Sequence, residues 1–238
     1  MSLLVDFCDH KAAKHAVMHW HYSKTMPLGR MVKMGVWEEG DFIGAVIFGR
    51  GGNRHLGRPY GVENTGVCEL VRVALKDHQT TVTQIVSLAL RQLKESSPGI
   101  RVVISFADSS QGHLGTIYQA GNWMYLGTTT PTPEYFYHGT WVHHRRVTGT
   151  AMGSEPIEVA GGMSYTQLAA SLPQRPGSVK FRYAYPLDKK MRRLLNSMSL
   201  PYPTADDLAA QVSEAKHRPT RSEGQVQSLG AALDLMEG

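Results

Sequence analysis

The sequence predicts an α/β fold of the α+β kind, in which a central mixed sheet is flanked by helices. Residues 33–48 hold two apolar stretches around a glycine-bearing turn, a pattern typical of an antiparallel hairpin. Residues 67–75 predict a third strand, and an amphipathic helix follows from Thr81. An apolar run over residues 102–108 then ends on a carboxylate, at the kind of strand end where α/β proteins build their sites.

The remaining elements follow from apolar periodicity and from residues that start or stop helices. A first helix is expected over residues 6–19, because small apolar residues recur on one side of it. In the helix from Thr81, Gln84 completes the spacing of a capping box, and Pro98-Gly99 ends the helix. After residue 108 we expect a short helix through Leu114, Ile117 and Tyr118, and strands at 123–127 and 135–142.

The composition is that of an ordinary globular protein: 238 residues, of which 42% are hydrophobic, can bury a substantial core. Cys8 and Cys68 stand alone, which excludes a disulfide framework and a cysteine-based zinc site built from this chain alone. No secretion signal and no apolar stretch of about 18 residues occurs. We therefore expect a soluble protein of a reducing cytoplasm, without a membrane partner.

The charge balance, 25 Lys and Arg against 20 Asp and Glu, favours a polyanionic partner. The glycine-rich segment 49–61 carries Arg50, Arg54 and Arg58 without any acid and can wrap a phosphate backbone. A second basic run is interleaved with aromatic residues that can contact nucleic acid. Its candidate DNA-binding residues are Lys180, Arg182, Lys189, Lys190, Arg192 and Arg193. A solvated basic face that binds nothing is the alternative interpretation of both segments.

Residues 18–30 concentrate imidazole, phenol, ammonium and guanidinium groups just before and at a Pro/Gly turn. His21 is a candidate acid or base, because the ordinary pKa of histidine lies near neutrality. Tyr22 can donate a hydrogen bond or stack on an extruded base. His19 and His21 are candidate metal ligands, although His19 can equally be a surface residue.

Three further side chains are candidates for chemistry. Asp108 can accept a proton or hydrogen bond from a ligand's amino group, or it can cap the turn that follows. Arg72 lies in mid-strand, so its guanidinium must face a polar cleft, where it can hold a carbonyl or phosphate, or pair with Glu69 or Asp108. Tyr118 can donate a hydrogen bond or stack on a base, or it can belong to the core.

The predicted order of elements (helix, hairpin, strand, helix, strand, helix, two strands) resembles that of the GNAT acyltransferase fold. This resemblance implies a donor bound where the central strands splay, at the amino end of the next helix. GNAT enzymes usually have a glycine-bearing pyrophosphate loop there, whereas residues 74–81 contain no glycine. Acetyl-coenzyme A is therefore the alternative donor rather than the first choice.

Several short blocks, taken together and in this order, resemble the phage Mom DNA-modification family. They are His21-Tyr22-Ser23 with Pro27, Leu70-Val71-Arg72, Phe106-Ala107-Asp108, Ile117-Tyr118-Gln119 and the segment 185–193. The resemblance covers residues 8–195. The occurrence of all these blocks together is more specific than the occurrence of any single block. The functional positions that it implies are His21, Tyr22, Arg72, Asp108 and Tyr118.

The Mom resemblance implies an enzyme that converts adenine in DNA to a carbamoylmethylated, or acetamido, form. Such a modification protects phage DNA from restriction in the cytoplasm of the bacterial host. Double-stranded DNA is the implied partner, base flipping would give access to adenine, and an iron ion is implied as a cofactor. The alternatives are a GNAT-like N-acetyltransferase acting on a small amine or protein, and a non-catalytic DNA-binding protein on the same scaffold.

The structure of the implied product restricts which molecule can be the group donor. Ordinary acyl transfer leaves a carbonyl on the adenine amino nitrogen, whereas a carbamoylmethyl group has a methylene there. A glycyl group is an isomer of the carbamoylmethyl group, so transfer of an activated glycine followed by rearrangement balances every atom. We therefore hypothesise glycyl-tRNA or another activated glycine as the donor, which makes tRNA a second partner.

For the domain organisation we expect three segments. Residues 1–150 form a GNAT-like catalytic core, and residues 151–195 form a basic extension that packs on the core and contacts DNA. Residues 196–238 form a flexible tail with short helices near 205–215 and 225–236, to which we assign no chemistry. The sequence is compatible with a homodimer and does not determine the oligomeric state.

Overall fold

The computed structural model describes residues 2–27, 29–50, 55–147 and 164–217. The chain divides into two compact units. The core unit comprises residues 1–107, 113–128 and 181–203, and the second unit comprises residues 108–112, 129–180 and those from 204 onward. Each unit combines segments that are distant in the sequence.

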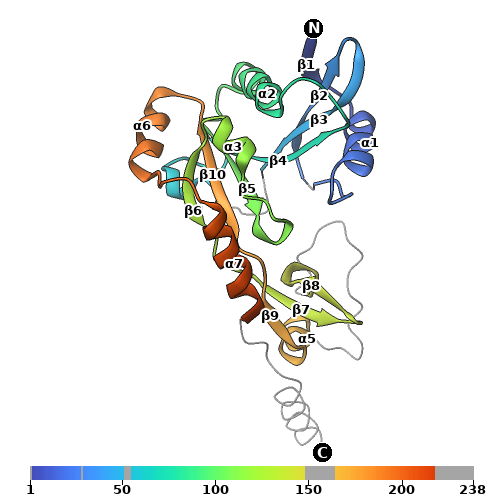
Figure 1. The fold of residues 1–238 in the computed structure, drawn as a ribbon, viewed down its shortest axis with the longest axis vertical. Helices are drawn as coiled ribbons and strands as arrows, with labels where there is room; N and C mark the ends of the chain where they lie inside the picture. The colour runs from blue at the N-terminus through green and yellow to red at the C-terminus, as the bar shows by residue number, and fades with distance from the viewer. Residues whose placement is uncertain (1, 28, 51–54, 148–163, 218–238) are drawn as a thin grey trace, which may run out of the picture. The chain divides into compact units, whose positions relative to one another are not determined.

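Helices and strands alternate along most of the chain (Figure 1). None of the described helices combines the length and apolarity that a membrane crossing requires. In order the elements are β1 Leu3–Phe7, α1 His10–Trp20, β2 Met31–Glu38, β3 Asp41–Gly49, η1 Arg58–Tyr60, β4 Val67–Leu75, α2 Val82–Ser96, β5 Val102–Asp108, η2 Ser109–Gln111, α3 Thr116–Ala120, β6 Met124–Thr128, β7 Pro133–Tyr137, β8 Thr140–His143, α4 His144–Val147, α5 Tyr165–Ser171, β9 Gln174–Pro176, β10 Lys180–Pro186, α6 Lys189–Met198 and α7 Ala205–His217.

The central sheet has the strand order β1-β2-β3-β4-β5-β10-β6. The pairs β1–β2, β2–β3, β3–β4 and β10–β6 are antiparallel, whereas β4 and β5 are parallel. The helix α2 connects the two parallel strands, as a crossover must. The central mixed sheet is accompanied by helices, so the predicted α/β fold class is confirmed. The sequence did not foresee that β10 would lie between β5 and β6.

The parallel strands β4 and β5 pair over only part of their length. Their register runs from Val67 opposite Val102 to Glu69 opposite Ile104, and the rest of each strand diverges from the other. On the other edge of β4, Ile47 faces Arg72 and Phe48 faces Leu70, so Val71 forms a bulge. Bulges bend a strand and redirect its side chains, and they are common beside active sites. We call the region beyond these pairs, where β4 and β5 are no longer paired, the splay.

Helices α1 and α2 of the core unit are held by apolar faces. In α1, Ala13, Ala16 and Val17 are fully buried and belong to a cluster with Ala45, Ile47 and Ala74. In α2 the buried residues are Ile85, Val86, Ala89, Leu90 and Leu93, which include most of the predicted face. These contacts fix the amino end of α2 and the carboxyl end of α1 beside the sheet.

Two local predictions at helix starts were wrong. The helix α1 begins at His10, since Asp9 caps it by accepting from the Ala12 N–H, and residues 3–7 form β1 instead. Pairing with β2 stabilises this extended segment more than an extra helical turn would. Thr81 is the N-cap of α2, but its side chain makes no capping hydrogen bond, so the predicted capping box is absent.

The second unit contains a smaller antiparallel sheet of order β8-β7-β9. Tyr135, Val142 and Val147 form its buried cluster, against which Leu168 and Leu172 pack. The single strand expected over residues 135–142 is a hairpin, because His138 and Gly139 turn the chain with φ of +45° and +80°. A non-glycine residue at positive φ is uncommon, so the sequence pattern did not predict a turn at His138.

Candidate active site

Arg72 ties the loop after α1 to the central sheet. Its Nε and Nη2 both donate to the Thr25 carbonyl at 3.3 Å, and its Nη1 donates to the Val71 carbonyl at 2.7 Å. Burial lowers the pKa of Arg72, while Tyr22 and Glu69 act in the opposite direction. The guanidinium, still charged at neutral pH, therefore positions the segment 21–25 against β4.

His21 is the C-cap residue of α1 and is half-buried. Its Nδ1 lies 3.1 Å from the Ser23 backbone N–H nitrogen and 2.8 Å from Ser23 Oγ. A backbone N–H can only donate, so we infer that Nδ1 accepts and the ring proton sits on Nε2. Burial, then Arg72 and His113, lower the pKa of His21 to about 4. His21 is therefore neutral at pH 7, with an Nε2–H that can donate a hydrogen bond.

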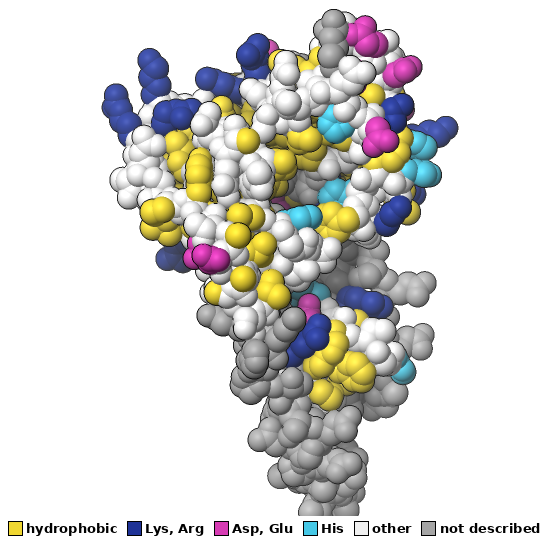
Figure 2. All heavy atoms as spheres, viewed as in Figure 1, with side chains coloured by type: hydrophobic (Ala, Val, Ile, Leu, Met, Phe, Trp, Pro, Cys, Tyr) yellow, Lys and Arg dark blue, Asp and Glu magenta, His cyan; other side chains and the backbone are white. Residues whose placement is uncertain are grey.

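Aromatic rings extend the site from His21 outward. The His21 and Tyr22 ring centroids lie 4.4 Å apart, and Tyr22 contacts His113 edge-on at 5.5 Å. Tyr22 is 58% exposed, so a ligand can reach its ring. Figure 2 shows histidine side chains beside a hollow on the displayed face of the molecule. Such an exposed ring between polar groups can stack on a planar base.

Tyr118 of α3 reaches β5 at the point where the strands part. The Ser105 hydroxyl lies 2.7 Å from Tyr118 Oη and 2.9 Å from the Leu70 carbonyl, and it bridges β4 and β5 one residue beyond their last pair. Burial raises the pKa of Tyr118 to about 12, although the Ser105 hydrogen bond lowers it. Tyr118 therefore keeps its proton, and when it accepts from Ser105 it can donate that proton to a ligand in the splay.

His21, Tyr22, Arg72 and Tyr118 thus interact within the core unit: Arg72 acts electrostatically on His21, and Tyr22 acts on Arg72 and Tyr118. The structure adds three residues, Ser105, Glu69 and His113. A hydroxyl inside an apolar strand is a sequence signal that could have identified Ser105 as a site residue. The sequence suggested Glu69 only as an ion-pair partner of Arg72, and it contains no signal that identifies His113 as a site residue.

Asp108 belongs to the second unit and caps η2 there. Its Oδ1 accepts from the Ser110 N–H at 3.0 Å and from the Ser110 hydroxyl at 2.7 Å, and its Oδ2 lies 3.5 Å from Lys180 Nζ. Burial alone would raise the pKa of Asp108, but Ser110, Lys180 and Ser178 outweigh burial and lower it. The capping role that the sequence left open is therefore present.

The stability of the protein should depend on His21 between pH 6.5 and 4. The folded state binds this proton less readily than the unfolded chain, because the pKa falls from 6.5 to about 4 on folding. The unfolded chain therefore takes up more protons in this window, and stability is lost as the pH falls through it. Thermal unfolding from pH 4 to 7 should show a steeper loss of Tm for the wild type than for His21→Gln. Parallel curves would contradict the shift.

The described residues do not fit the iron ion that the resemblance implied. Nowhere in the described ranges do three or more His, Cys, Asp or Glu side chains form a group able to hold a metal. His19 Nδ1 lies 2.8 Å from the His15 carbonyl and the two rings stack, while Ser23 occupies His21 Nδ1. We derive no chemical step from a metal.

The predicted DNA-binding residues differ in exposure. Arg54 lies outside the described residues, and Arg182 is half-buried and donates to the Leu126 carbonyl at 3.0 Å. Lys180 pairs with Asp108. The exposed cations are Arg50, Arg58, Lys189, Lys190, Arg192 and Arg193. The last four belong to α6, which buries Met191 and Leu195 on its opposite face.

The model of the Mom protein family matches residues 2–204, nearly the whole described chain. This chain belongs to the Mom protein family. It is similar to a protein of Escherichia phage Mu named methylcarbamoylase mom, at 30% identity over 201 residues that cover 80% of this chain and 79% of that protein. The family predicted from short sequence blocks is thus confirmed.

Among solved structures, the chain is similar to N-acetyltransferases at low sequence identity. For the N-acetyltransferase from Staphylococcus aureus Mu50 the identity is 10%, the TM-score is 0.45, and 79% of this chain and 99% of that chain are covered. For the aminoglycoside 6'-N-acetyltransferase from Enterococcus faecium the values are 9%, 0.43, 84% and 99%.

Proposed function

We propose that this Mom-family protein is a DNA-modifying transferase that places a small amide-containing group on the amino nitrogen of adenine. The observation that carries the proposal is the arrangement around the splay of the sheet. Arg72 of β4 holds the loop that bears His21 and Tyr22, and Ser105 joins Tyr118 to β4 where β4 and β5 cease to pair. These residues supply neutral donors, a fixed cation and an exposed aromatic ring. Together they suit acyl-type transfer to a weakly nucleophilic aromatic amine.

The name of the phage Mu relative bears on the identity of the transferred group. A methylcarbamoyl group joins nitrogen through its carbonyl carbon, whereas the carbamoylmethyl group expected from the sequence joins through a methylene. The two groups are isomers, and only the methylcarbamoyl group forms by acyl transfer without rearrangement. We therefore propose methylcarbamoyl transfer, with the carbamoylmethyl isomer as the competing product.

Each residue at the splay has a proposed task. Tyr118 and the Nε2–H of His21 donate hydrogen bonds to the donor carbonyl, where negative charge develops in the transition state. Arg72 holds the loop that carries His21 and Tyr22. Tyr22 stacks on an adenine flipped out of the duplex. Ser105 orients the Tyr118 hydroxyl.

We propose double-stranded DNA as the partner and Lys190 and Arg193 of α6, both exposed, as backbone contacts. Modification of adenine would change the surface that restriction enzymes read in the major groove, which supports a protective role for phage DNA in the host cytoplasm. The donor stays a proposal: methylcarbamoyl transfer needs a methylcarbamoyl derivative of a leaving group, such as one on coenzyme A whose thiol departs. An activated glycine such as glycyl-tRNA would give the carbamoylmethyl isomer after rearrangement.

Nucleoside analysis of plasmid DNA from bacteria that express the protein tests this function. We expect a deoxyadenosine derivative that carries the mass of either isomer in wild-type samples and is reduced by Tyr118→Phe, with an empty vector as the control. Fragmentation separates the isomers, because a methylcarbamoyl group leaves as methyl isocyanate and returns deoxyadenosine. Unmodified DNA in the presence of abundant folded protein would overturn the proposal.

A further inference from the structure

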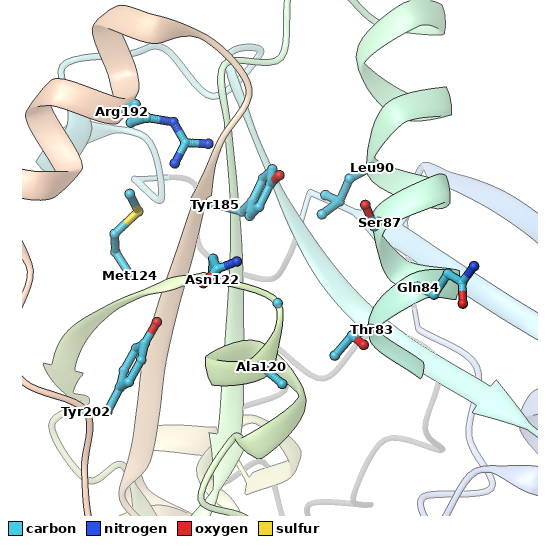
Figure 3. Close-up of a pocket in the computed structure, with 11 residues that line it drawn as sticks. Thr83, Gln84, Ser87, Leu90, Ala120, Asn122, Met124, Tyr185, Arg192 and Tyr202 are labelled. Atoms are coloured by element: carbon cyan, nitrogen blue, oxygen red, sulfur yellow. The ribbon is translucent and has the colours of Figure 1, made fainter. Parts of the chain in front are cut away.

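A cavity of about 690 Å³ lies in the core unit, away from the residues of the splay. It is lined by α2, by the end of α3, by β6 and by Tyr185 of β10, with Arg192 entering from α6 (Figure 3). Gln84, Ser87 and Asn122 add polar side chains, and Tyr185 and Tyr202 add aromatic rings. The cavity therefore offers a guanidinium, amides and stacking surfaces to one ligand.

An adjoining cavity of about 300 Å³ extends this space along α2. It shares Ser87, Leu90, Tyr185 and Arg192 with the first cavity, and we call the two together the α2–α6 cleft. Arg91, Lys94 and Lys189 line the extension. Its one acid, Asp188, is already paired with Arg101 at 2.7 Å and caps α6, so it does not neutralise these cations. The cleft is strongly positive.

The turn before α2, where a GNAT enzyme would cradle a diphosphate, is occupied by the protein itself. The Glu38 carboxylate accepts from the Gln79 N–H at 3.0 Å, from the Thr80 N–H at 2.8 Å and from the Thr80 hydroxyl at 2.5 Å. These hydrogen bonds, that of the Thr80 hydroxyl first, lower the pKa of Glu38. A cavity of about 470 Å³ beside the turn is lined by three further carboxylates, Glu39, Asp41 and Asp77, against one cation, Lys76. A phosphate there would meet like charge and occupied amides.

We propose that the α2–α6 cleft binds a phosphate-bearing nucleotide that forms part of the group donor, with Arg192 as phosphate ligand and Tyr185 as stacking ring. The inference rests on the proposed function, because it presumes a donor. Charge complementarity and the size of the cleft favour such an occupant. Trp123 lies between the ring of Tyr118 at 5.2 Å and that of Tyr185 at 5.4 Å, so the cleft adjoins the splay across one aromatic residue.

Calorimetric titration of the full chain with ADP tests the site. Arg192→Gln should weaken ADP binding by about tenfold or more, because a charge-assisted hydrogen bond is lost. The matched control is Arg193→Gln, the next residue of α6, which is exposed and does not line the cleft. Arg193→Gln and Glu38→Gln should each leave the affinity within about twofold of the wild type, as expected for surface changes away from the ligand.

The remaining probes identify the source of the nucleotide. Coenzyme A and a short oligonucleotide ending in an unpaired adenosine are titrated in the same way, and the tighter of the two indicates the donor class. Equal effects of Arg192→Gln and Arg193→Gln would overturn the proposal, as would a shift caused by Glu38→Gln or the absence of ADP binding. The two proposals fail separately. Unmodified DNA with persisting Arg192-dependent binding overturns the proposed function alone, and modified DNA without that binding overturns the proposed site alone.

Discussion

Arg72→Met is expected to lower the rate of DNA modification by about 100-fold, since displacing reacting groups by about 1 Å has an effect of that order. The substitution removes the hydrogen bonds to the Thr25 carbonyl, so the segment that carries His21 and Tyr22 loses its attachment to β4. Arg72→Lys should recover only part of the rate, because an ammonium cannot reproduce the planar fork of a guanidinium. Nucleoside analysis after timed expression measures both effects.

The role of Arg72 is distinguished from a purely structural one by a matched variant. Arg175→Met breaks the Arg175–Glu134 ion pair of the second unit, which is partly exposed, and should leave the modification rate almost unchanged. Hydrogen exchange of residues 21–27 should rise in Arg72→Met and stay constant in Arg175→Met. A full modification rate in Arg72→Met would show that this loop needs no anchor.

Tyr118→Phe is expected to reduce modification by roughly 100- to 1000-fold, the range found when one donor to a developing oxyanion is removed. The change keeps the ring and deletes only the hydroxyl that lies 2.7 Å from Ser105 Oγ. Because burial raises the pKa of Tyr118 to about 12, the phenol stays protonated at every practical pH. The rate that depends on this hydroxyl should therefore show no titration between pH 6 and 9.

Tyr183→Phe is the matched control for Tyr118→Phe. The two rings lie 5.2 Å apart, and the Tyr183 hydroxyl donates to the Leu114 carbonyl at 2.7 Å inside the core unit. Losing that buried hydrogen bond should lower Tm while leaving the modification rate of the remaining folded protein close to that of the wild type. If Tyr183→Phe slowed modification as much as Tyr118→Phe, the Tyr118 hydroxyl would have no specific catalytic role.

The sequence alone determined the elements whose apolar pattern is strong. The strands at 67–75 and 102–108 and the buried face of α2 were predictable because buried apolar residues repeat with a clear period. The short blocks around His21, Arg72 and Tyr118 also predicted the family, because the residue types themselves specify the chemistry of the side chains. The local sequence pattern did not predict the strand β1, because its extended conformation comes from pairing with β2.

Only the tertiary structure decided how the site is assembled. The sequence places Ser105 inside an apolar strand, but its role at the splay depends on how far β4 and β5 stay paired. It suggested His21 as a candidate, but the neutral state of the ring depends on burial beside Arg72, and its tautomer depends on the Ser23 contacts. The place of β10 in the sheet and the occupation of the α2 turn by Glu38 likewise arise from contacts between distant segments. Periodicity and composition depend only on the residue types along the chain. The protonation state of a side chain, or the occupation of a turn by another side chain, depends on neighbours that are brought close only by folding.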